Sequence, residues 1–292
     1  MDAADRSSLP RRVPPSGPAA RSPLPRAADD LPVIGGQFWS TLDAGLAELA
    51  LELSNAERAA IDVHVRLLLA WNAHMNLTAV RDVAGIARAH VLDTLLAIPV
   101  LRRLSGGAPP SVLDLGSGAG YPGLPLAVVL PARRAALVDS ITKKATFLAV
   151  AAAAAVEAQR RTGSEAGEIT ALAERAEDLA EEPEQRDAWD IVVARAVGSV
   201  AEVAELGLPL ARRGGHVAIW KRDAGDGALR REIGRAARVV QAAGGGPPRV
   251  MSLEGADRVG LQSHCLVVIT KQRPTPDRYP RPAGERRRRA LT

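Results

Sequence analysis

The sequence predicts an α/β fold in which helices cover both faces of a mostly parallel sheet of about seven strands that ends in an antiparallel hairpin. After Pro109 and Pro110, short apolar runs alternate with helical periodicity, a pattern typical of a parallel sheet. The last two apolar runs, 249–253 and 264–270, have no helix between them and therefore predict the hairpin. Aromatic residues make up only 3% of the chain, so Ala, Val, Leu and Ile must build the core.

Composition divides the 292 residues into one folded unit and two segments of biased composition. Residues 1–36 hold seven prolines without periodicity and predict a disordered leader. Residues 37–108 predict an N-terminal helical segment, and residues 109–272 predict the sheet domain. Residues 273–292 combine prolines with arginines and predict a disordered basic tail.

The helical segment carries local signals for two helices. Ser54 and Glu57 have the spacing of a capping box, and apolar residues then recur at helical intervals. A polar loop over 72–82 separates this helix from a second one over about 83–103.

The sheet domain alternates strands and helices in chain order. Strands are expected at 111–115, 135–139, 169–173, 191–196, 216–221, 249–253 and 264–270. Helices are expected at about 122–130, 142–161, 199–212 and 226–243. The carboxyl ends of the parallel strands should meet at one edge of the sheet, where ligands bind in folds of this kind.

Charge and cysteine content restrict the class of protein. The net charge is +5, but residues 271–292 carry eight basic and two acidic residues, so the rest of the chain has a net charge of −1. One cysteine, Cys265, excludes an intramolecular disulfide and a thiolate metal cluster, and it suits the reducing cytoplasm. The longest fully apolar run, 147–156, is shorter than the roughly 20 residues of a membrane span. We therefore expect a cytoplasmic protein without a membrane segment or secretory signal.

The strongest local motif is a glycine loop that follows the first strand of the sheet. Gly116 and Gly118 belong to a G-x-G-x-G pattern, and Asp114 lies two residues before the first glycine. A dinucleotide fingerprint, G-x-G-x-x-G, would need a glycine where this chain has Tyr121. A pyrophosphate also avoids a nearby carboxylate, whereas the ammonium and sulfonium of S-adenosylmethionine favour one. Asp139, at the end of the second strand, can accept hydrogen bonds from ribose hydroxyls. The loop therefore predicts a Rossmann-like class I fold that binds S-adenosylmethionine.

The chain lacks the residues that several kinds of methyl transfer need. Cys265 lies in the terminal hairpin, far along the sheet from the loop, so it is a poor nucleophile for pyrimidine C5 methylation. The strand over 191–196 is not followed by the proline-rich element that amine methylation uses, and no carboxylate cluster indicates a metal. An acceptor with a free lone pair, such as guanine N7, remains plausible and needs no catalytic base.

Six short blocks of the chain resemble one family of bacterial enzymes, the glucose-inhibited division protein B family of small-subunit rRNA guanine-N7 methyltransferases. They follow one another at the family's spacing within residues 54–270. The blocks are WNAHMNLTAVRD at 71–82, HVLD at 90–93, GSGAGYPGLPL at 116–126, DSITKK at 139–144, RAE at 175–177 and ARA at 194–196.

The resemblance implies methylation of a guanine in the 530 loop of 16S rRNA, with the rRNA or the small subunit as partner and the protein as a monomer. It implies cofactor contacts from Gly116, Tyr121, Ala176, Glu177 and Arg195, in addition to the loop glycine Gly118 and the acid Asp139. It places Asn76, Lys143, Arg175 and Lys221 near the RNA or the acceptor base. Tyr121 departs from the family, which often has Leu or Phe there, so an apolar cofactor contact becomes an aromatic one.

Three other functions stay open at this stage. A small-molecule N- or O-methyltransferase would use the N-terminal helices as a lid over its acceptor. A nucleotide-binding RNA chaperone would use the same loop without catalysis. A dehydrogenase is disfavoured by the spacing of the glycines.

Overall fold

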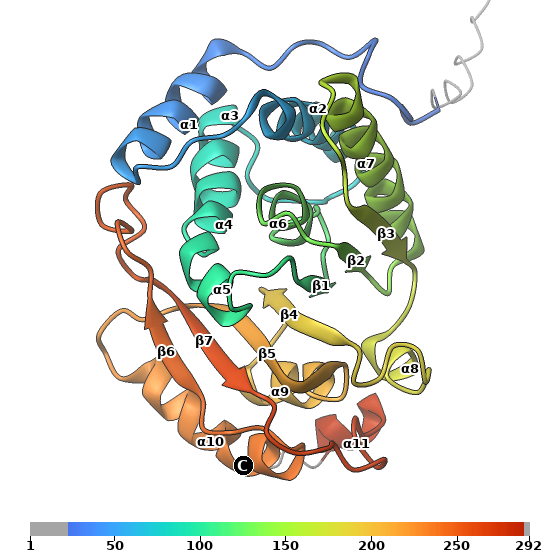
Figure 1. Cartoon of the computed structure of the whole chain (residues 1–292), viewed down its shortest axis with the longest axis vertical. Coiled ribbons are helices and arrows are strands. Elements are labelled where there is room, and N and C mark those ends of the chain that lie inside the picture. Colours follow the sequence, from blue (N-terminus) through green and yellow to red (C-terminus); the bar gives the residue numbers. More distant parts are fainter. Residues whose placement is uncertain (1–22, 289–292) are drawn as a thin grey trace, which may run out of the picture.

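The computed structural model of the protein describes residues 23–288 and has a seven-stranded sheet between two layers of helices (Figure 1). The strand order is β3-β2-β1-β4-β5-β7-β6. The strands are β1 (Ser111–Leu115), β2 (Arg134–Val138), β3 (Glu168–Leu172), β4 (Trp189–Arg195), β5 (Ala211–Arg222), β6 (Arg249–Ser252) and β7 (His264–Thr270). Strands β1 to β5 pair in parallel, and β7 is antiparallel to both β5 and β6. The expected hairpin is therefore confirmed.

Helices alternate with the parallel strands as the sequence predicts. They are α1 (Gly36–Glu48), α2 (Asn55–Asn72), α3 (Val83–Ile86), the π-helical segment η1 (Ala87–Leu92), α4 (Asp93–Leu95), α5 (Ile98–Leu104), α6 (Gly123–Val129), α7 (Thr142–Arg161), α8 (Ala176–Leu179), α9 (Val200–Gly207), α10 (Ala228–Ala242) and α11 (Ala283–Arg288). The helix expected over 199–212 ends early, because Pro209 has no amide hydrogen with which to continue it.

Alternation along the strands separates two apolar cores. Val112 of β1 packs with α2, α6 and α7 on one face, whereas Leu113 and Leu115 pack with α9 and α10 on the other. Asp114 shares the face of Val112, because successive strand residues point to opposite sides. The N-terminal helices lie on the same face of the sheet as α6 and α7 (Figure 1). This is also the face to which Asp114 points.

Helix α2 begins as its sequence predicts. The Ser54 hydroxyl accepts a hydrogen bond from the Glu57 amide (3.3 Å), and the Glu57 carboxylate accepts one from the Ser54 amide (2.6 Å). This capping box satisfies amides that have no partner inside the helix. The buried face of α2 packs against α7 and brings His64 toward the sheet.

A buried carboxylate fastens the amino-terminal edge of the sheet. Asp190 of β4 accepts hydrogen bonds from the Ser111 amide and hydroxyl (both 2.7 Å), from Arg133 (2.8 Å) and from Arg212 (2.5 Å). Burial alone would raise the pKa of Asp190, but these donors outweigh it and lower the pKa to about 2. The edge opposite the glycine loop is thus held rigidly in register.

The helical run Val83–Leu104 is long and apolar enough to cross a membrane by length and composition. In the folded protein, however, 61% of its most apolar window is buried. Ile86, Leu92 and Leu95 are fully inside the first core. This run is therefore a core helix of the protein.

The expectation of a disordered leader is wrong for residues 23–36. The Trp71 indole donates to the Pro25 carbonyl (2.9 Å), and Arg66 donates to the carbonyls of Ala28 (2.5 Å) and Pro32 (3.1 Å). Ala28 and Ile34 are buried against the helices. The segment is ordered because side chains of α2 satisfy its carbonyl groups, and residues 1–22 lie outside the described residues.

The expectation of a disordered tail is likewise wrong for residues 273–288. Arg186 donates to the carbonyls of Thr275 (3.0 Å) and Tyr279 (3.1 Å). Arg281 forms an ion pair with Glu205 of α9 (2.6 Å), and both side chains are buried. The tail thus ends as helix α11 beside α8 and α9 (Figure 1), and residues 289–292 lie outside the described part of the chain.

Removal of Arg281 should destabilise the protein strongly, because it leaves the Glu205 carboxylate buried without its partner. We expect Arg281→Met to lower the free energy of unfolding by about 3–5 kcal/mol, measured by urea denaturation. The double variant Glu205→Leu with Arg281→Met should recover most of that loss. The exposed Arg288→Ala serves as the matched control. If the Arg281→Met variant were as stable as this control, the ion pair between Arg281 and Glu205 would not stabilise the fold as we expect.

Candidate active site

A cavity of about 640 Å³ opens at the carboxyl edge of the parallel strands. The glycine loop after β1 forms one wall, and the ends of β4 and β5 form another. The N-terminal segment supplies the third wall through Thr78 and His90. The cavity therefore lies at the edge of the sheet that the sequence predicted, but it is completed by residues outside the sheet domain.

Asp139, which follows the neighbouring strand β2, fixes the backbone of the glycine loop. Its carboxylate accepts one hydrogen bond from the Gly118 amide (3.1 Å) and another from the Ile141 amide (2.9 Å). Gly118 has a φ of +56°, a left-handed conformation that most side chains disfavour. A Cβ at Gly120 would lie 2.8 Å from the His64 ring, so the loop approaches α2 too closely for any other residue.

Asp114 is a buried carboxylate with spare acceptor capacity. One oxygen accepts from the Gly123 amide at the start of α6 (2.8 Å), and the other makes no hydrogen bond within the described residues. Asp114 also forms no ion pair in that part of the chain, and burial raises its pKa to about 6. Neither Asp114 nor Asp139 lines the cavity, but both are bonded to the backbone around the glycine loop, where their negative charge favours a cationic ligand over a pyrophosphate.

Histidine 64 connects α2 to the glycine loop. Its Nε2 lies 2.8 Å from the Ala119 carbonyl oxygen, which can only accept, so Nε2 carries the hydrogen. Burial lowers the pKa of His64 from 6.5 to about 4, and the ring is therefore neutral at physiological pH. Because its folded pKa is depressed, the stability it contributes is present above pH 6.5 and is lost as the pH falls toward 4.

Three rings pack in a row beside the cavity, with Tyr121 stacked on His90 and tilted against His64. Tyr121 lies between His64 and His90, with ring centroids 4.6 Å and 4.9 Å apart. The Arg195 guanidinium lies 5.6 Å from the Tyr121 centroid. The stack joins α2, the glycine loop and the π-helical segment, so it fixes the N-terminal segment against the sheet domain.

Arg195 is positioned by the same N-terminal segment. It donates to the Ala89 carbonyl (3.1 Å) and to the buried Asp93 carboxylate (3.0 Å), whose other oxygen lies 2.6 Å from His264 Nδ1. His90 Nδ1 lies 3.2 Å from Arg195 Nη2 and 3.1 Å from the Ala89 carbonyl oxygen, so Arg195 and His90 share that carbonyl. Burial and the Arg195 charge together lower the pKa of His90 to about 4.

His90 in turn orients the loop that follows α2. Its Nε2 lies 2.8 Å from the Thr78 hydroxyl, and the same hydroxyl accepts from the Val80 amide (3.1 Å). Asn72 closes the other side of this loop, because its side chain accepts from the Leu77 amide (2.9 Å) and donates to the Thr78 carbonyl (3.1 Å). The loop that faces the cavity is thus held by side chains at both ends.

The structure brings together part of the predicted cofactor set. Gly116, Gly118, Tyr121 and Arg195 line the cavity, and Asp139 contacts Gly118. The two remaining positions, Ala176 and Glu177, begin α8 after β3 and do not line it. Glu177 instead pairs with Arg286 of the tail (2.5 Å).

Of the four residues predicted to contact RNA, only one lines the cavity. Lys221 lines the cavity, where it donates to the Gly198 carbonyl (2.9 Å) and pairs with Glu232 (2.7 Å). Asn76, Lys143 and Arg175 are exposed and do not line the cavity.

Sequence reasoning did not single out several residues that shape the site. The lining includes Thr78, Trp220 and Arg222. It also includes Lys144, which lies 4.0 Å from Asp139; the paired lysines of the DSITKK motif pointed to this turn of α7, and of the two it is Lys144 that reaches the cavity. His64 gave no signal beyond a polar residue on an apolar helix face.

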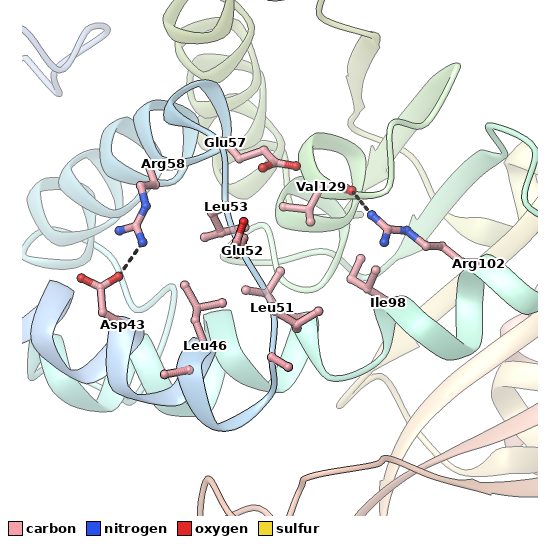
Figure 2. Close-up of a pocket in the computed structure, with 13 residues that line it drawn as sticks. Asp43, Leu46, Leu51, Glu52, Leu53, Glu57, Arg58, Ile98, Arg102 and Val129 are labelled. Carbon is pink, nitrogen blue, oxygen red and sulfur yellow. Dashed lines mark hydrogen bonds and ion pairs between the residues drawn. The ribbon is translucent and has the colours of Figure 1, made fainter.

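A second cavity, of about 910 Å³, lies between α1, α2 and α5 (Figure 2). Leu46, Leu51 and Ile98 line it, and Asp43 pairs with Arg58 at its rim (2.7 Å). None of the predicted site residues lies there. Although larger, it has neither the glycine loop nor the strand ends that would hold a nucleoside.

The fold and the site define a class of protein. The strand order with an antiparallel β7, the glycine loop after β1 and the acid after β2 are those of class I S-adenosylmethionine-dependent methyltransferases. Solved structures similar to the chain include a SAM-dependent methyltransferase from Aquifex aeolicus, with 16% identity, TM-score 0.41, and coverage of 63% of this chain and 91% of that one. Aeropyrum pernix fibrillarin has 16% identity, TM-score 0.41, and coverage of 60% and 74%.

Sequence comparisons narrow the class to a family. Residues 57–232 match the family model described as rRNA small subunit methyltransferase G. Ribosomal RNA small subunit methyltransferase G of Roseiflexus sp. strain RS-1 is 40% identical over 226 residues, which cover 77% of this chain and 87% of the relative. The Moorella thermoacetica protein of the same name is 35% identical over 84% of this chain and 94% of the relative. The chain belongs to the rRNA small subunit methyltransferase G family.

Loss of the His64 hydrogen bond should loosen the glycine loop. We expect His64→Leu to weaken S-adenosylmethionine binding about fivefold, because one buried hydrogen bond is worth about 1 kcal/mol. Isothermal titration calorimetry measures the effect directly.

His64→Gln keeps a side-chain donor and should restore part of the affinity. The KM for RNA should be the same in all three proteins, since His64 faces the loop and is fully buried. Equal cofactor affinity in the Leu variant and the unaltered protein would show that the contact is only structural.

Proposed function

We propose that the protein transfers the methyl group of S-adenosylmethionine to N7 of a guanine in the 530 loop of 16S rRNA. The observation that carries this proposal is the single cavity that joins the glycine loop to a basic rim. Family membership supports the rRNA substrate, because the relatives carry that name. The protein would act as a monomer in the cytoplasm on the rRNA or on the small subunit.

The residues present fit this cofactor. Gly116, Gly118 and Tyr121 would face its methionine and ribose. Each oxygen of Asp139 accepts one backbone amide, and their remaining lone pairs would accept the ribose hydroxyls. Ala176 and Glu177, which lie outside this cavity, would contact the adenine only where the cofactor extends past Asp139 toward the end of β3. The buried, unpaired oxygen of Asp114 favours a ligand with positive charge at the methionine end. When bound, the cofactor supplies an electrophilic methyl group on a sulfonium.

The side chains around the cavity suit a reaction without proton removal. Guanine N7 attacks through a lone pair, the carbon–sulfur bond breaks, and the electron pair stays on sulfur, so the purine gains the positive charge. His90 is neutral, and its two ring nitrogens already face Arg195 and Thr78. The residues therefore contribute by position, which is the main source of rate in such a transfer.

Cys265 does not support an alternative through a thiolate. Burial raises its pKa to about 11, and its thiol donates to the Lys221 carbonyl (3.7 Å). A thiol in that state is a poor nucleophile. This favours a lone-pair acceptor over pyrimidine C5.

The rim of the cavity favours an anionic substrate over a neutral small molecule. Lys144, Lys221 and Arg222 line it from α7 and β5; Lys221 pairs with Glu232, and Lys144 lies 4.0 Å from Asp139. Its one acidic lining residue, Asp93, is paired with Arg195 and His264, so the exposed Arg222, which forms no ion pair within the described residues, carries the excess positive charge of the rim. Basic side chains at the mouth attract the phosphates beside a target base. Asn76, Lys143 and Arg175 would extend this contact outside the cavity.

Mass spectrometry of 16S rRNA from cells with and without the gene tests the proposal. We expect one 7-methylguanosine in the 530 loop to disappear on deletion and to return with the unaltered gene. It should not return with Arg195→Ala, which removes the contacts to Ala89 and Asp93. Circular dichroism of the purified variant shows whether it is folded.

Two results would contradict the proposal. One is an unchanged 530 loop after deletion of the gene. The other is transfer of labelled methyl groups to a metabolite but not to rRNA, which would favour the small-molecule methyltransferase.

A further inference from the structure

Helix α10 carries a row of arginines along its outer face. Arg231, Arg235 and Arg238 are exposed, and they recur at four and three residues, which places them on one side of a helix. The opposite side is buried against the second core through Leu229 and Val240. We call Arg231, Arg235 and Arg238 the arginine row.

The charges of Arg231 and Arg235 are not neutralised by their own helix. Glu232 is the only acid within α10, and it pairs with Lys221 of β5 (2.7 Å). Arg231 and Arg235 form no ion pair with any residue between 23 and 288. Arg231 donates only to the Asp226 carbonyl (3.3 Å), which leaves most of its guanidinium hydrogens free.

The row begins next to the cavity. Glu232, one residue along from Arg231, accepts from Lys221 Nζ and from the Val200 amide (both 2.7 Å). Lys221 itself donates to Gly198, and both of these residues line the cavity. From Arg231 the row extends about 10 Å along the helix, at about 1.5 Å per residue. It is therefore continuous with the basic rim formed by Lys221 and Arg222.

The segment around α8, which like α10 packs against α9, has the reverse charge. The segment from the end of β3 to the turns after α8 has six acidic residues and one basic residue between positions 174 and 184. These acids repel phosphates except where Arg175 is exposed, whereas the arginines of α10 attract them. The difference in charge favours α10 over the α8 segment for extended contact with a polyanion.

We propose that the arginine row binds the phosphate backbone of the RNA that flanks the target guanine, while the rim residues hold the nucleotides nearest to it. This inference rests on the proposed function and adds where the substrate lies. Arginine suits the role because its planar guanidinium forms paired hydrogen bonds to phosphate oxygens. Each phosphate contact releases bound counterions, so RNA affinity carries a measurable dependence on salt.

The test compares two triple variants of equal charge. One replaces Arg231, Arg235 and Arg238 with Gln, and the matched control replaces the exposed arginines Arg103, Arg160 and Arg278 with Gln. Affinity for purified small subunits from the deletion strain, and for their naked 16S rRNA, is measured between 50 and 200 mM salt, roughly the range over which phosphate contacts dominate. S-adenosylmethionine affinity is measured in parallel.

We expect the α10 variant to lose about two in the slope of log affinity against log salt and to bind RNA at least about tenfold more weakly at low salt. The control should lose much less, and both should bind the cofactor normally. Equal slopes for the α10 variant and the unaltered protein would overturn the inference, as would equal losses in the two variants.

The outcome separates the two proposals. If the unaltered protein methylates the 530 loop and the α10 variant keeps the full salt slope, only the proposed role of the arginine row is wrong. An unaltered protein that forms no 7-methylguanosine on either substrate overturns the proposed function itself.

Discussion

The site depends on the hydrogen bonds by which two buried carboxylates hold the backbone between β1 and α6. Asp139 fixes the Gly118 amide from the next strand, and Asp114 fixes the Gly123 amide at the start of α6. Asp114 lies in β1, and Asp139 follows β2, its parallel neighbour. The pairing of these two strands therefore sets the distance between the two carboxylates and the position of the loop backbone that they bind. A buried carboxylate is costly unless donors surround it, so these amides are held in place as firmly as the acids are.

The N-terminal segment completes the site rather than covering it. His64 holds the loop from α2, and Ala89 and Asp93 hold Arg195 from the helix that contains the π-helical segment. The Tyr121 ring lies between histidines of these two helices. Docking of the segment therefore determines the geometry of the glycine loop and of the strand end at the same time. A sheet domain alone would lack this wall of the cavity.

Local signals predicted much of the fold. The capping box at Ser54, the span of β1 and the glycine loop match the structure because neighbouring residues encode them. The order of the leader and the tail was missed, because it depends on donors far away in the chain, such as Arg66 and Arg186. The same holds for His64, whose partner Ala119 is 55 residues distant. Glycine motifs predicted one wall of the cavity, whereas the proposal for the arginine row of α10 depends on the contact between Glu232 and Lys221, which the sequence does not show.

The most direct measurement of the central claim is a crystal structure of the protein with S-adenosylmethionine. The account predicts density in the cavity at the strand ends, with the ribose at Asp139 and the methyl group directed to the rim that Lys221 and Arg222 form. Density in the cavity between α1, α2 and α5 (Figure 2), or density that does not touch the glycine loop, would contradict it.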